Sequence, residues 1–475
     1  MVVGEIALER DLIIIGGGPG GYTAAIRAAQ LGKEVTIIEK EELGGICLNR
    51  GCIPSKIVSY ISAKLQDYKQ ASVFGFELGD IGFDYKKANL YKYTVIDNLH
   101  KGIKALCRQN KIEILKGTAS FLANGRIGVE DGDDCAVYTF NSAIIATGGS
   151  LKPKVHVDRS LVLDAAALYE LEDIPDSLII HGSDYISIEA AFSFKALGSE
   201  VHLVIDKEEF PGLDISINKE LFRQLKKQNI KIYKNMNLHD VIKKGQVISA
   251  LFHSKNDNRI TLEASYIFCQ SVSEPNLTNI GVDRLGITLD GDGYIKVNSQ
   301  CKTSLENVWA VGDVTGTPQL AAKAIRQGKV AAESICGIAA EYSGALLPIV
   351  IHSIPPIAYA GLTEDKAKSA GYEIKTGGLN IGSNGYASLT GQKDGIFKVI
   401  SDKHTDLILG IHLYGRNAIE LISTGILAME MAGREEDLKF PIYPHPTINE
   451  SLMEAVEALV SQAIHQPKTK TAVQK

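Results

Sequence analysis

The sequence lacks the features that mark secreted and membrane proteins. Its 475 residues include only seven cysteines, an odd number that does not suit the dense disulfide framework of small secreted domains. No apolar run approaches the ~20 residues of a membrane-spanning helix. Residues 1–10 contain Glu5 and Glu9, without the basic start and apolar stretch of a signal peptide. We therefore expect a cytoplasmic protein with no membrane association.

The sequence also lacks an excess of positive charge. Fifty Lys and Arg stand against 56 Asp and Glu, for a formal net charge of −6, so no nucleic-acid-binding footprint is expected. Hydrophobic residues make up 45% of the chain, which is enough for two or more domains with substantial cores.

A strand–loop–helix–strand pattern opens the chain. Residues 11–15 predict a buried parallel strand, the glycines of residues 16–21 follow, and an Ala-rich helix is expected over residues 22–32. A second strand over residues 34–38 ends at Glu39. The glycines allow the backbone to approach a pyrophosphate at the helix N-terminus, and an acid about 20 residues further on can bond a ribose hydroxyl. The pattern predicts a dinucleotide-binding unit.

The same pattern returns in a weaker form. A strand over residues 177–181, a loop and helix up to Gly198, and a strand over residues 200–205 ending at Asp206 repeat the topology. The glycines of this second loop are eroded, but the repeat still predicts a second nucleotide-binding domain.

The pattern changes beyond about residue 347. Alternating strands over residues 395–400 and 407–414 and helices over residues 418–431 and 449–463 indicate an α+β C-terminal domain. The expected fold class is therefore α/β, with two Rossmann-like nucleotide-binding domains and a C-terminal α+β domain.

Two cysteines lie just behind the first glycine loop. Cys47 and Cys52 have four residues between them, a spacing too wide for the usual zinc or thioredoxin pairs but suited to a disulfide across one helical turn. The spacing alone leaves open that both are unpaired buried cysteines. Five others have no partner at a useful spacing and are predicted to be packing residues: Cys107, Cys135, Cys269, Cys301 and Cys336.

The run Cys47-Leu-Asn-Arg-Gly-Cys52-Ile-Pro-Ser-Lys56 resembles the active-site signature of the FAD-dependent pyridine nucleotide disulfide oxidoreductases, nearest to the dihydrolipoyl dehydrogenases. Residues 303–313 resemble the second FAD motif of this family, and Ala146-Thr147-Gly148 resembles the strand end that returns toward the flavin. Residues 445–450, His-Pro-Thr-Ile-Asn-Glu, resemble its C-terminal His-Glu motif. The likeness spans essentially the whole chain.

The resemblance implies a division into domains. An FAD-binding domain is expected in two parts, residues 1–150 and 276–346. Between them lies an NAD-binding-like domain (residues 151–275), and a dimerisation domain (residues 347–475) follows.

The resemblance also assigns catalytic roles. Cys52 would lie against the flavin, and Cys47 would exchange with the substrate dithiol. His445 would be the base, with Glu450 orienting its ring, and relatives supply this pair from the partner subunit of a homodimer. Lys56, paired with Glu189, would tune the flavin electrostatically.

The expected cofactors are FAD and NAD. The residues expected to contact FAD are Gly16, Gly18, Gly21, Glu39, Lys40, Gly45, Lys56, Ala119, Thr147, Gly148, Asp313, Gln319, Leu320 and Ala321. Gly182 and Asp206 are expected to contact NAD, and Asp206 argues against NADP.

The NAD site departs from the pattern of the family. Asp184 replaces the glycine that admits the pyrophosphate, Ser187 replaces the packing glycine, and Val272 replaces a glycine on the nicotinamide side. Two like charges about 4 Å apart cost ~1 kcal/mol in water and ~4 kcal/mol at an effective dielectric near 20. We therefore expect roughly ten- to thousand-fold weaker NAD binding, unless the loop moves or the carboxylate of Asp184 turns away. Ile46 and Tyr443 also depart from relatives, without removing a required group.

Several residues have an alternative structural interpretation. Thr447 and Glu450 form a possible capping box for the last helix, which is compatible with Glu450 also binding an imidazole. Lys56 and His445, taken alone, could each be an ordinary surface residue. Glu189 is harder to explain in this way, because it is expected on a helix that faces the sheet and unpaired buried carboxylates are rare.

The resemblance implies oxidation of dihydrolipoamide by NAD⁺ to give lipoamide and NADH. The partner would be dihydrolipoamide or the lipoyl domain of a 2-oxo-acid dehydrogenase complex. Two alternatives remain open, namely a related disulfide reductase with another thiol substrate or a non-nicotinamide electron partner, and a non-catalytic flavoprotein scaffold.

Overall fold

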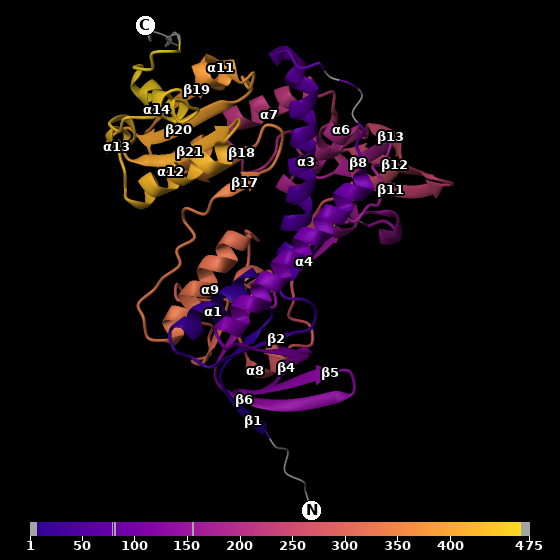
Figure 1. The fold of residues 1–475 in the computed structure, drawn as a ribbon, viewed down its shortest axis with the longest axis vertical. Helices are drawn as coiled ribbons and strands as arrows, with labels where there is room; N and C mark the ends of the chain where they lie inside the picture. Colours follow the sequence, from indigo (N-terminus) through magenta and orange to yellow (C-terminus); the bar gives the residue numbers. More distant parts are fainter. Residues whose placement is uncertain (1–6, 78, 80–81, 154–155, 467–475) are drawn as a thin grey trace, which may run out of the picture.

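The computed structural model describes residues 7–77, 79, 82–153 and 156–466. Three bodies that each contain a sheet make up the molecule, and Figure 1 shows the first at the bottom, the second at the upper right and the C-terminal one at the upper left. The long helices α3 (Cys52–Gln70) and α4 (Tyr85–Gln109) run from the first body toward the second.

The first sheet has the strand order β3-β2-β1-β6-β5-β4, with β16 also paired to β6. Strands β1, β2, β3, β6 and β16 are parallel, while β4 and β5 form antiparallel pairs. The bounds are β1 Ala7–Ile15, β2 Val35–Glu39, β3 Glu113–Lys116, β4 Thr118–Ala123, β5 Arg126–Asp131, β6 Asp134–Ile145 and β16 Val308–Ala310. Because β16 joins this sheet, the chain beyond residue 300 returns to the body in which it began.

Small residues bring helices α1 (Pro19–Gln30) and α9 (Ala321–Ile335) side by side against the first sheet, as Figure 1 also shows. A Cβ added at Gly328 would lie 2.4 Å from the carbonyl oxygen of Gly20. The buried face of α1 is largely alanine, so it packs closely on β1 and β2 without displacing the strands.

The second sheet is parallel, in the order β10-β9-β8-β14. Its elements are β8 Ser177–His181, α6 Tyr185–Leu197, β9 Glu200–Val204, α7 Ile215–Lys227, β10 Lys231–Tyr233 and β14 Tyr266–Cys269. The predicted repeat of the strand–helix–strand unit is confirmed in its topology. An antiparallel three-stranded sheet that the sequence did not reveal is inserted before β14: β11 Met236–Lys244, β12 Val247–Ser254 and β13 Arg259–Ala264.

The C-terminal body contains an antiparallel sheet in the order β17-β18-β21-β20-β19. Its elements are β17 Ile349–Ile351, β18 Ile357–Gly361, α10 Glu364–Ser369, β19 Ile374–Asn380, β20 Ile396–Asp402, β21 Ile408–Tyr414, α12 Ala418–Glu430 and α14 Glu450–Glu457. The last helix is shorter than the predicted residues 449–463, because a 3₁₀ turn over Ala458–Val460 and a left-handed Ser461 (φ +60°) end it.

Shorter elements complete the chain. They are α2 Gly45–Asn49, β7 Gly149–Pro153, α5 Ala165–Tyr169, β15 Ser271–Pro275, α8 Val282–Leu285, α11 Gly385–Leu389 and α13 Glu435–Lys439. Strands β7 and β15 pair with each other where the chain leaves and re-enters the first body. Among the described residues, no helix is both long and apolar enough to cross a membrane.

A buried ionic cluster joins the second body to the C-terminal one. Lys398 on β20 contacts Asp214, the N-cap residue of α7, at 2.7 Å and Glu364 on α10 at 2.6 Å. The side chains of Lys398 and Asp214 are 5% and 0% exposed. Although burial opposes the shift, the bond from Lys398 holds the pKa of Asp214 below its usual value.

We expect Lys398→Met to lower the free energy of unfolding by about 3–5 kcal/mol, because it leaves the Asp214 carboxylate buried without its cation. Urea denaturation followed by circular dichroism measures the change. Lys368→Met is the matched control, since Lys368 is 58% exposed and contacts Glu364 only at 3.4 Å. The control should change stability by no more than about 0.5 kcal/mol, and equal losses in the two variants would contradict a buried ionic link.

Candidate dithiol and flavin site

Cys47 and Cys52 form a disulfide whose Cα atoms lie 4.6 Å apart. The expectation that they share one helical turn is wrong. Cys47 lies within α2, whereas Cys52 is the first residue of α3, and Arg50 and Gly51 form the break between the two helices. Both cysteines are half-buried, so a substrate thiol can approach the bond.

Bare glycine backbone holds this disulfide beside the first nucleotide loop. A Cβ added at Gly45, which begins α2 and has a φ of +58°, would lie 2.9 Å from the Cα of Gly18. At the same loop, the backbone N–H of Gly17 donates to Oε2 of Glu39 at 2.7 Å. The predicted Gly18, Gly45 and Glu39 are therefore neighbours in the structure.

The rest of the first loop is packed too tightly to tolerate side chains. A Cβ at Gly16 (φ +102°) would lie 2.4 Å from the carbonyl oxygen of Ala146, and one at Gly21 would lie 1.9 Å from the carbonyl oxygen of Gly16. The strand end at Ala146-Thr147-Gly148 thus adjoins the glycine loop, as the resemblance implied. The buried Oγ1 of Thr147 has no hydrogen-bond partner among the described residues, as expected of a group that awaits a ligand.

Other residues predicted to contact FAD lie around the same edge of the first sheet. Gly117, at the start of β4, donates its N–H to the carbonyl oxygen of Glu39, which brings the strand carrying Ala119 next to β2. Asp313 follows β16, and burial raises the pKa of its carboxyl group. Gln319 and Leu320 lead directly into α9. A loop of bare glycines and an unpartnered buried hydroxyl fit the pyrophosphate and hydroxyl groups of FAD.

Lys56 and Glu189 form the predicted ion pair. Nζ of Lys56, one turn after Cys52, donates to the two carboxylate oxygens of Glu189 at 2.7 and 3.0 Å. Glu189 is 1% exposed, and its Oε1 also accepts the backbone N–H of His352 at 2.8 Å. The expectation that this buried carboxylate has a partner is confirmed. Lys56 also lies 5.8 Å from the ring centroid of Tyr185, a contact that the sequence did not suggest.

The His-Glu motif is assembled locally at the start of α14. Nδ1 of His445 lies 2.8 Å from Oε1 of Glu450, while Oε2 of Glu450 accepts the backbone N–H of Thr447 at 2.8 Å. Burial raises the pKa of Glu450, but the bonds from Thr447 and His445 outweigh it and lower that pKa below its usual value. Because an ionised carboxylate only accepts, Nδ1 of His445 donates to it, which leaves Nε2 outside this bond.

The capping-box interpretation of this motif is only half right. The helix begins at Glu450 with Asn449 as its N-cap, so Thr447 lies before the cap. The hydroxyl of Thr447 donates instead to the carbonyl oxygen of Pro444 at 2.8 Å. Glu450 does serve both its own helix start and the imidazole. The side chain of His445 is 80% exposed, and in the described part of the chain no hydrogen bond joins it to either cysteine.

The second nucleotide loop differs from the first. The carboxylate of Asp184 accepts from the N–H and the hydroxyl of Ser187 at 2.8 and 2.6 Å, as the N-cap of α6. Asp206 accepts the hydroxyl of Ser183 at 3.2 Å. The acid at the ribose end is thus in place, but the position that the pyrophosphate needs is taken by a carboxylate. This loop does not fit a dinucleotide as it stands.

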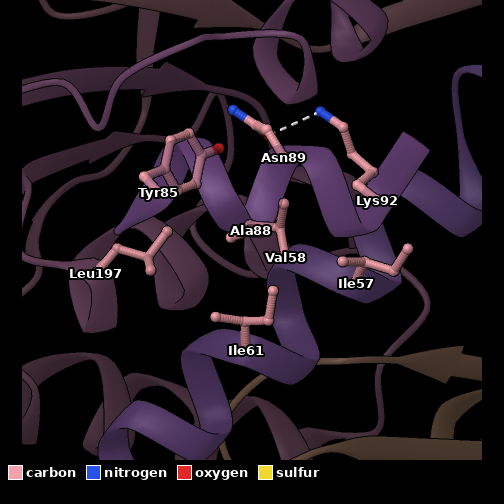
Figure 2. Close-up of a pocket in the computed structure, with 8 residues that line it drawn as sticks. All are labelled: Ile57, Val58, Ile61, Tyr85, Ala88, Asn89, Lys92 and Leu197. Carbon is pink, nitrogen blue, oxygen red and sulfur yellow. Dashed lines mark hydrogen bonds between the residues drawn. The ribbon is translucent and has the colours of Figure 1, made fainter. Parts of the chain in front are cut away.

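The apolar pocket in Figure 2 is separate from both loops. Residues of α3 (Ile57, Val58 and Ile61) face residues of α4, with Leu197 closing one side. Nζ of Lys92 donates to Oδ1 of Asn89 at 3.0 Å and to the carbonyl oxygen of Tyr169 at 2.6 Å. Because its cation is already bonded and none of the predicted site residues lines it, this pocket serves the packing of α3 on α4.

The free cysteines divide into two groups. Cys107, Cys269 and Cys301 are buried, as predicted for packing residues, and Cys336 is partly buried. Cys135 is exposed, so its predicted role in packing is wrong. Cys135 lies near the start of β6, directly after a charged turn, where the strand is exposed to solvent.

Two nucleotide-binding folds and an accessible disulfide beside the first of them define a disulfide oxidoreductase. Comparison of the sequence agrees: residues 10–328 match the pyridine nucleotide-disulphide oxidoreductase family, and residues 347–456 match the dimerisation domain of that family. The chain belongs to this family, whose cofactors are FAD and NAD.

Curated relatives match over almost the whole chain. Dihydrolipoyl dehydrogenase from Bacillus subtilis (strain 168) is 35% identical over 470 residues, covering 98% of this chain and 99% of the relative. Dihydrolipoyl dehydrogenase from Geobacillus stearothermophilus is 34% identical, with 98% and 99% covered.

Solved structures share the fold. The Cu(II) complex of the flavoprotein disulfide reductase RclA from Escherichia coli has a TM-score of 0.84 at 24% identity, covering 94% of this chain and 99% of that one. LpdA from Mycobacterium tuberculosis has a TM-score of 0.87 at 23% identity, with the same coverage. At these identities the likeness establishes the fold alone.

We expect Gly45→Ala to weaken FAD retention by about tenfold or more. The new methyl group would press on the Cα of Gly18 and push the two loops apart. A loss of about 1.4 kcal/mol in the binding free energy of FAD corresponds to tenfold weaker binding. The ratio of flavin to protein absorbance in the purified protein, after dilution and gel filtration, measures retention. Gly32→Ala is the control for left-handed strain alone, because Gly32 has a φ of +92° and nothing within 4 Å. Equal flavin content in both variants would rule out the close approach as the cause.

Proposed function

We propose that the protein is a dihydrolipoyl dehydrogenase, which oxidises dihydrolipoamide to lipoamide through the Cys47–Cys52 disulfide. The observation that carries the proposal is this accessible disulfide, held by Gly45 against the first nucleotide loop and followed one turn later by the Lys56–Glu189 pair. The names of the curated relatives support the choice of substrate.

The reaction begins with exchange at the outer sulfur. One thiolate of dihydrolipoamide attacks Sγ of Cys47, which forms a mixed disulfide and expels Cys52 as a thiolate. Nε2 of His445 takes the proton of the second substrate thiol, and the resulting thiolate attacks its own partner sulfur in the mixed disulfide. Lipoamide leaves, Cys47 becomes a thiolate, and the electron pair of the substrate now resides in the protein dithiol.

The first loop at Gly16 and Gly18 and the strand end at Thr147 would hold FAD, which would supply a carrier for this electron pair between the dithiol and an external acceptor. The amino group of Lys56, on the helix that Cys52 begins, is held in place by its hydrogen bonds to the carboxylate of Glu189. Glu450 holds the ring of His445 and stabilises the imidazolium once the proton has moved.

We propose that the working form is a homodimer in which His445 and Glu450 serve the disulfide of the other subunit. The matched dimerisation domain, the exposure of His445 and the exposed Phe440 and Ile442 close to it support this arrangement. The domain division at residues 150, 275 and 346 and the lipoyl domain as protein partner belong to the same proposal. A cytoplasmic location also belongs to it, because a reducing compartment suits a cycling dithiol.

Cys47→Ser should abolish dihydrolipoamide oxidation and leave a folded, yellow protein, because the outer sulfur is the atom that substrate attacks. Steady-state turnover with dihydrolipoamide, together with the flavin spectrum, measures both. Cys135→Ser is the matched control, since Cys135 is exposed and unpaired. A fully active Cys47→Ser enzyme would exclude this mechanism.

His445→Ala should slow the exchange step by about 10²–10⁴-fold through loss of the base. Anaerobic stopped-flow reduction of the flavin by dihydrolipoamide isolates this step. His404→Ala removes a histidine that is 68% exposed on the same domain and should leave the rate unchanged. If the rate in His445→Ala is unaltered, His445 is not the base, and Glu450 serves only to stabilise the start of its helix.

A further inference from the structure

In the second nucleotide loop, the carboxylate of Asp184 has already taken hydrogen-bond donors from the chain. In a loop ready for a dinucleotide, backbone donors at the helix N-terminus are left for the pyrophosphate. Here the carboxylate of Asp184 accepts from both the N–H and the hydroxyl of Ser187, at 2.8 and 2.6 Å. The anionic group that the start of α6 attracts is therefore part of the chain itself.

The two departures from the glycine pattern are partners of each other. Asp184 and Ser187 occupy the second and third glycine positions, and each supplies what the other needs: an acceptor on one side and two donors on the other. The two residues therefore act together at the start of α6.

The remaining glycine now serves the same pair. A Cβ at Gly182 would lie 2.3 Å from Oγ of Ser187 and 2.6 Å from Cβ of Gln270. Gly182 therefore makes room for the side chain of Ser187 and for Gln270. Its presence in the sequence does not indicate an open approach to a ligand.

Both polar groups of Ser183 are also bonded within the chain. The N–H of Ser183 donates to Oε1 of Gln270 at 2.9 Å, and the hydroxyl of Ser183 donates to Oδ1 of Asp206 at 3.2 Å. The acid expected to bind a ribose hydroxyl thus already has a donor. On the nicotinamide side, β15 carries Val272 and adds the carboxylate of Glu274, which pairs with Lys152 at 2.5 Å.

We propose that Asp184 is an internal competitor for the pyrophosphate group, so that this chain binds NAD(H) only when the Asp184–Ser187 pair opens. The inference rests on the proposed function and concerns its second half-reaction, the exit of electrons from the reduced enzyme. Asp184 thereby decides how readily a nicotinamide dinucleotide serves as acceptor. The dithiol half-reaction takes place beside the first nucleotide loop.

Electrostatics sets the size of the effect. A dinucleotide brings two phosphate charges toward a carboxylate that holds the helix donors, and it must also replace the two bonds from Ser187. Repulsion and displacement together correspond to about ten- to thousand-fold in affinity. Burial raises the pKa of Asp184 above its usual value, and the hydrogen bonds from Ser187 offset only part of that rise.

The test restores the three-glycine pattern. The FAD-loaded wild-type protein and the Asp184→Gly, Ser187→Gly double variant are each equilibrated with NAD⁺ under anaerobic conditions. Equilibrium dialysis measures the NAD⁺ bound, without turnover. We expect the double variant to bind NAD⁺ at least about tenfold more tightly than wild type. Asp184→Asn, which removes the charge and keeps an oxygen that can cap the helix, should give a smaller gain.

Asp164→Gly is the matched control. Asp164 caps α5 in the same way, with Oδ1 accepting the N–H of Ala167 at 2.8 Å, but it lies outside the loop. This variant should bind NAD⁺ as wild type does, so loss of a helix cap does not by itself explain a gain. If wild type binds NAD⁺ as tightly as the double variant, or if the double variant binds it less tightly, the proposal is overturned.

A separate measurement distinguishes this proposal from the proposed function. This measurement is the anaerobic reduction of the flavin of the wild-type protein by dihydrolipoamide. If the wild-type flavin is not reduced, the assigned substrate is wrong, while the NAD⁺ affinities still decide the role of Asp184. If the double variant does not fold, Ser187→Gly alone, which removes the hydroxyl donor, should still tighten NAD⁺ binding.

Discussion

The buried carboxylate of Glu189 is the point on which the arrangement of the site depends. It accepts hydrogen bonds from Lys56 on the dithiol helix and from the backbone of His352 at the entry to the C-terminal sheet, while it belongs to the central helix of the second nucleotide domain. A carboxylate that is 1% exposed cannot lose these partners without a large free-energy cost. Three segments far apart in the sequence are thereby held around one charge, and Cys52 lies one turn of α3 before Lys56.

Hydrophobic pattern predicted the parts of the fold whose strands are buried on both faces. The strand expected at residues 11–15 is the buried end of β1, and the repeat at residues 177–205 has the expected order. The three-stranded sheet before β14 was missed because β11 and β13 are largely exposed and alternate weakly. The break at Gly51, which puts the two cysteines on separate helices, was missed because their spacing alone also suits a single turn.

In the site, side-chain chemistry was easier to predict than the contribution of the backbone. The resemblance led to Lys56, Glu189, His445 and Glu450, and the structure brings each pair within hydrogen-bond distance. The N–H of His352 could not have been predicted, because every residue except proline offers the same donor. The hydroxyl of Thr447 was assigned to the wrong partner for a related reason: the carbonyl oxygen of Pro444 leaves no trace in a sequence pattern.

The two nucleotide loops share a topology and differ in what they leave unsatisfied. In the first, Cβ atoms at Gly16 and Gly21 would strike neighbouring backbone, and the loop adjoins a buried threonine hydroxyl without a partner among the described residues. In the second, the carboxylate of Asp184 and the hydroxyls of Ser183 and Ser187 are bonded within the loop or to the strand that follows it. Since a ligand gains most from donors that have no other acceptor, the capacity of such a fold to bind a dinucleotide depends on these free groups more than on its strand order. The first domain leaves such a group free, whereas in the second the carboxylate of Asp184 stabilises the start of its own helix.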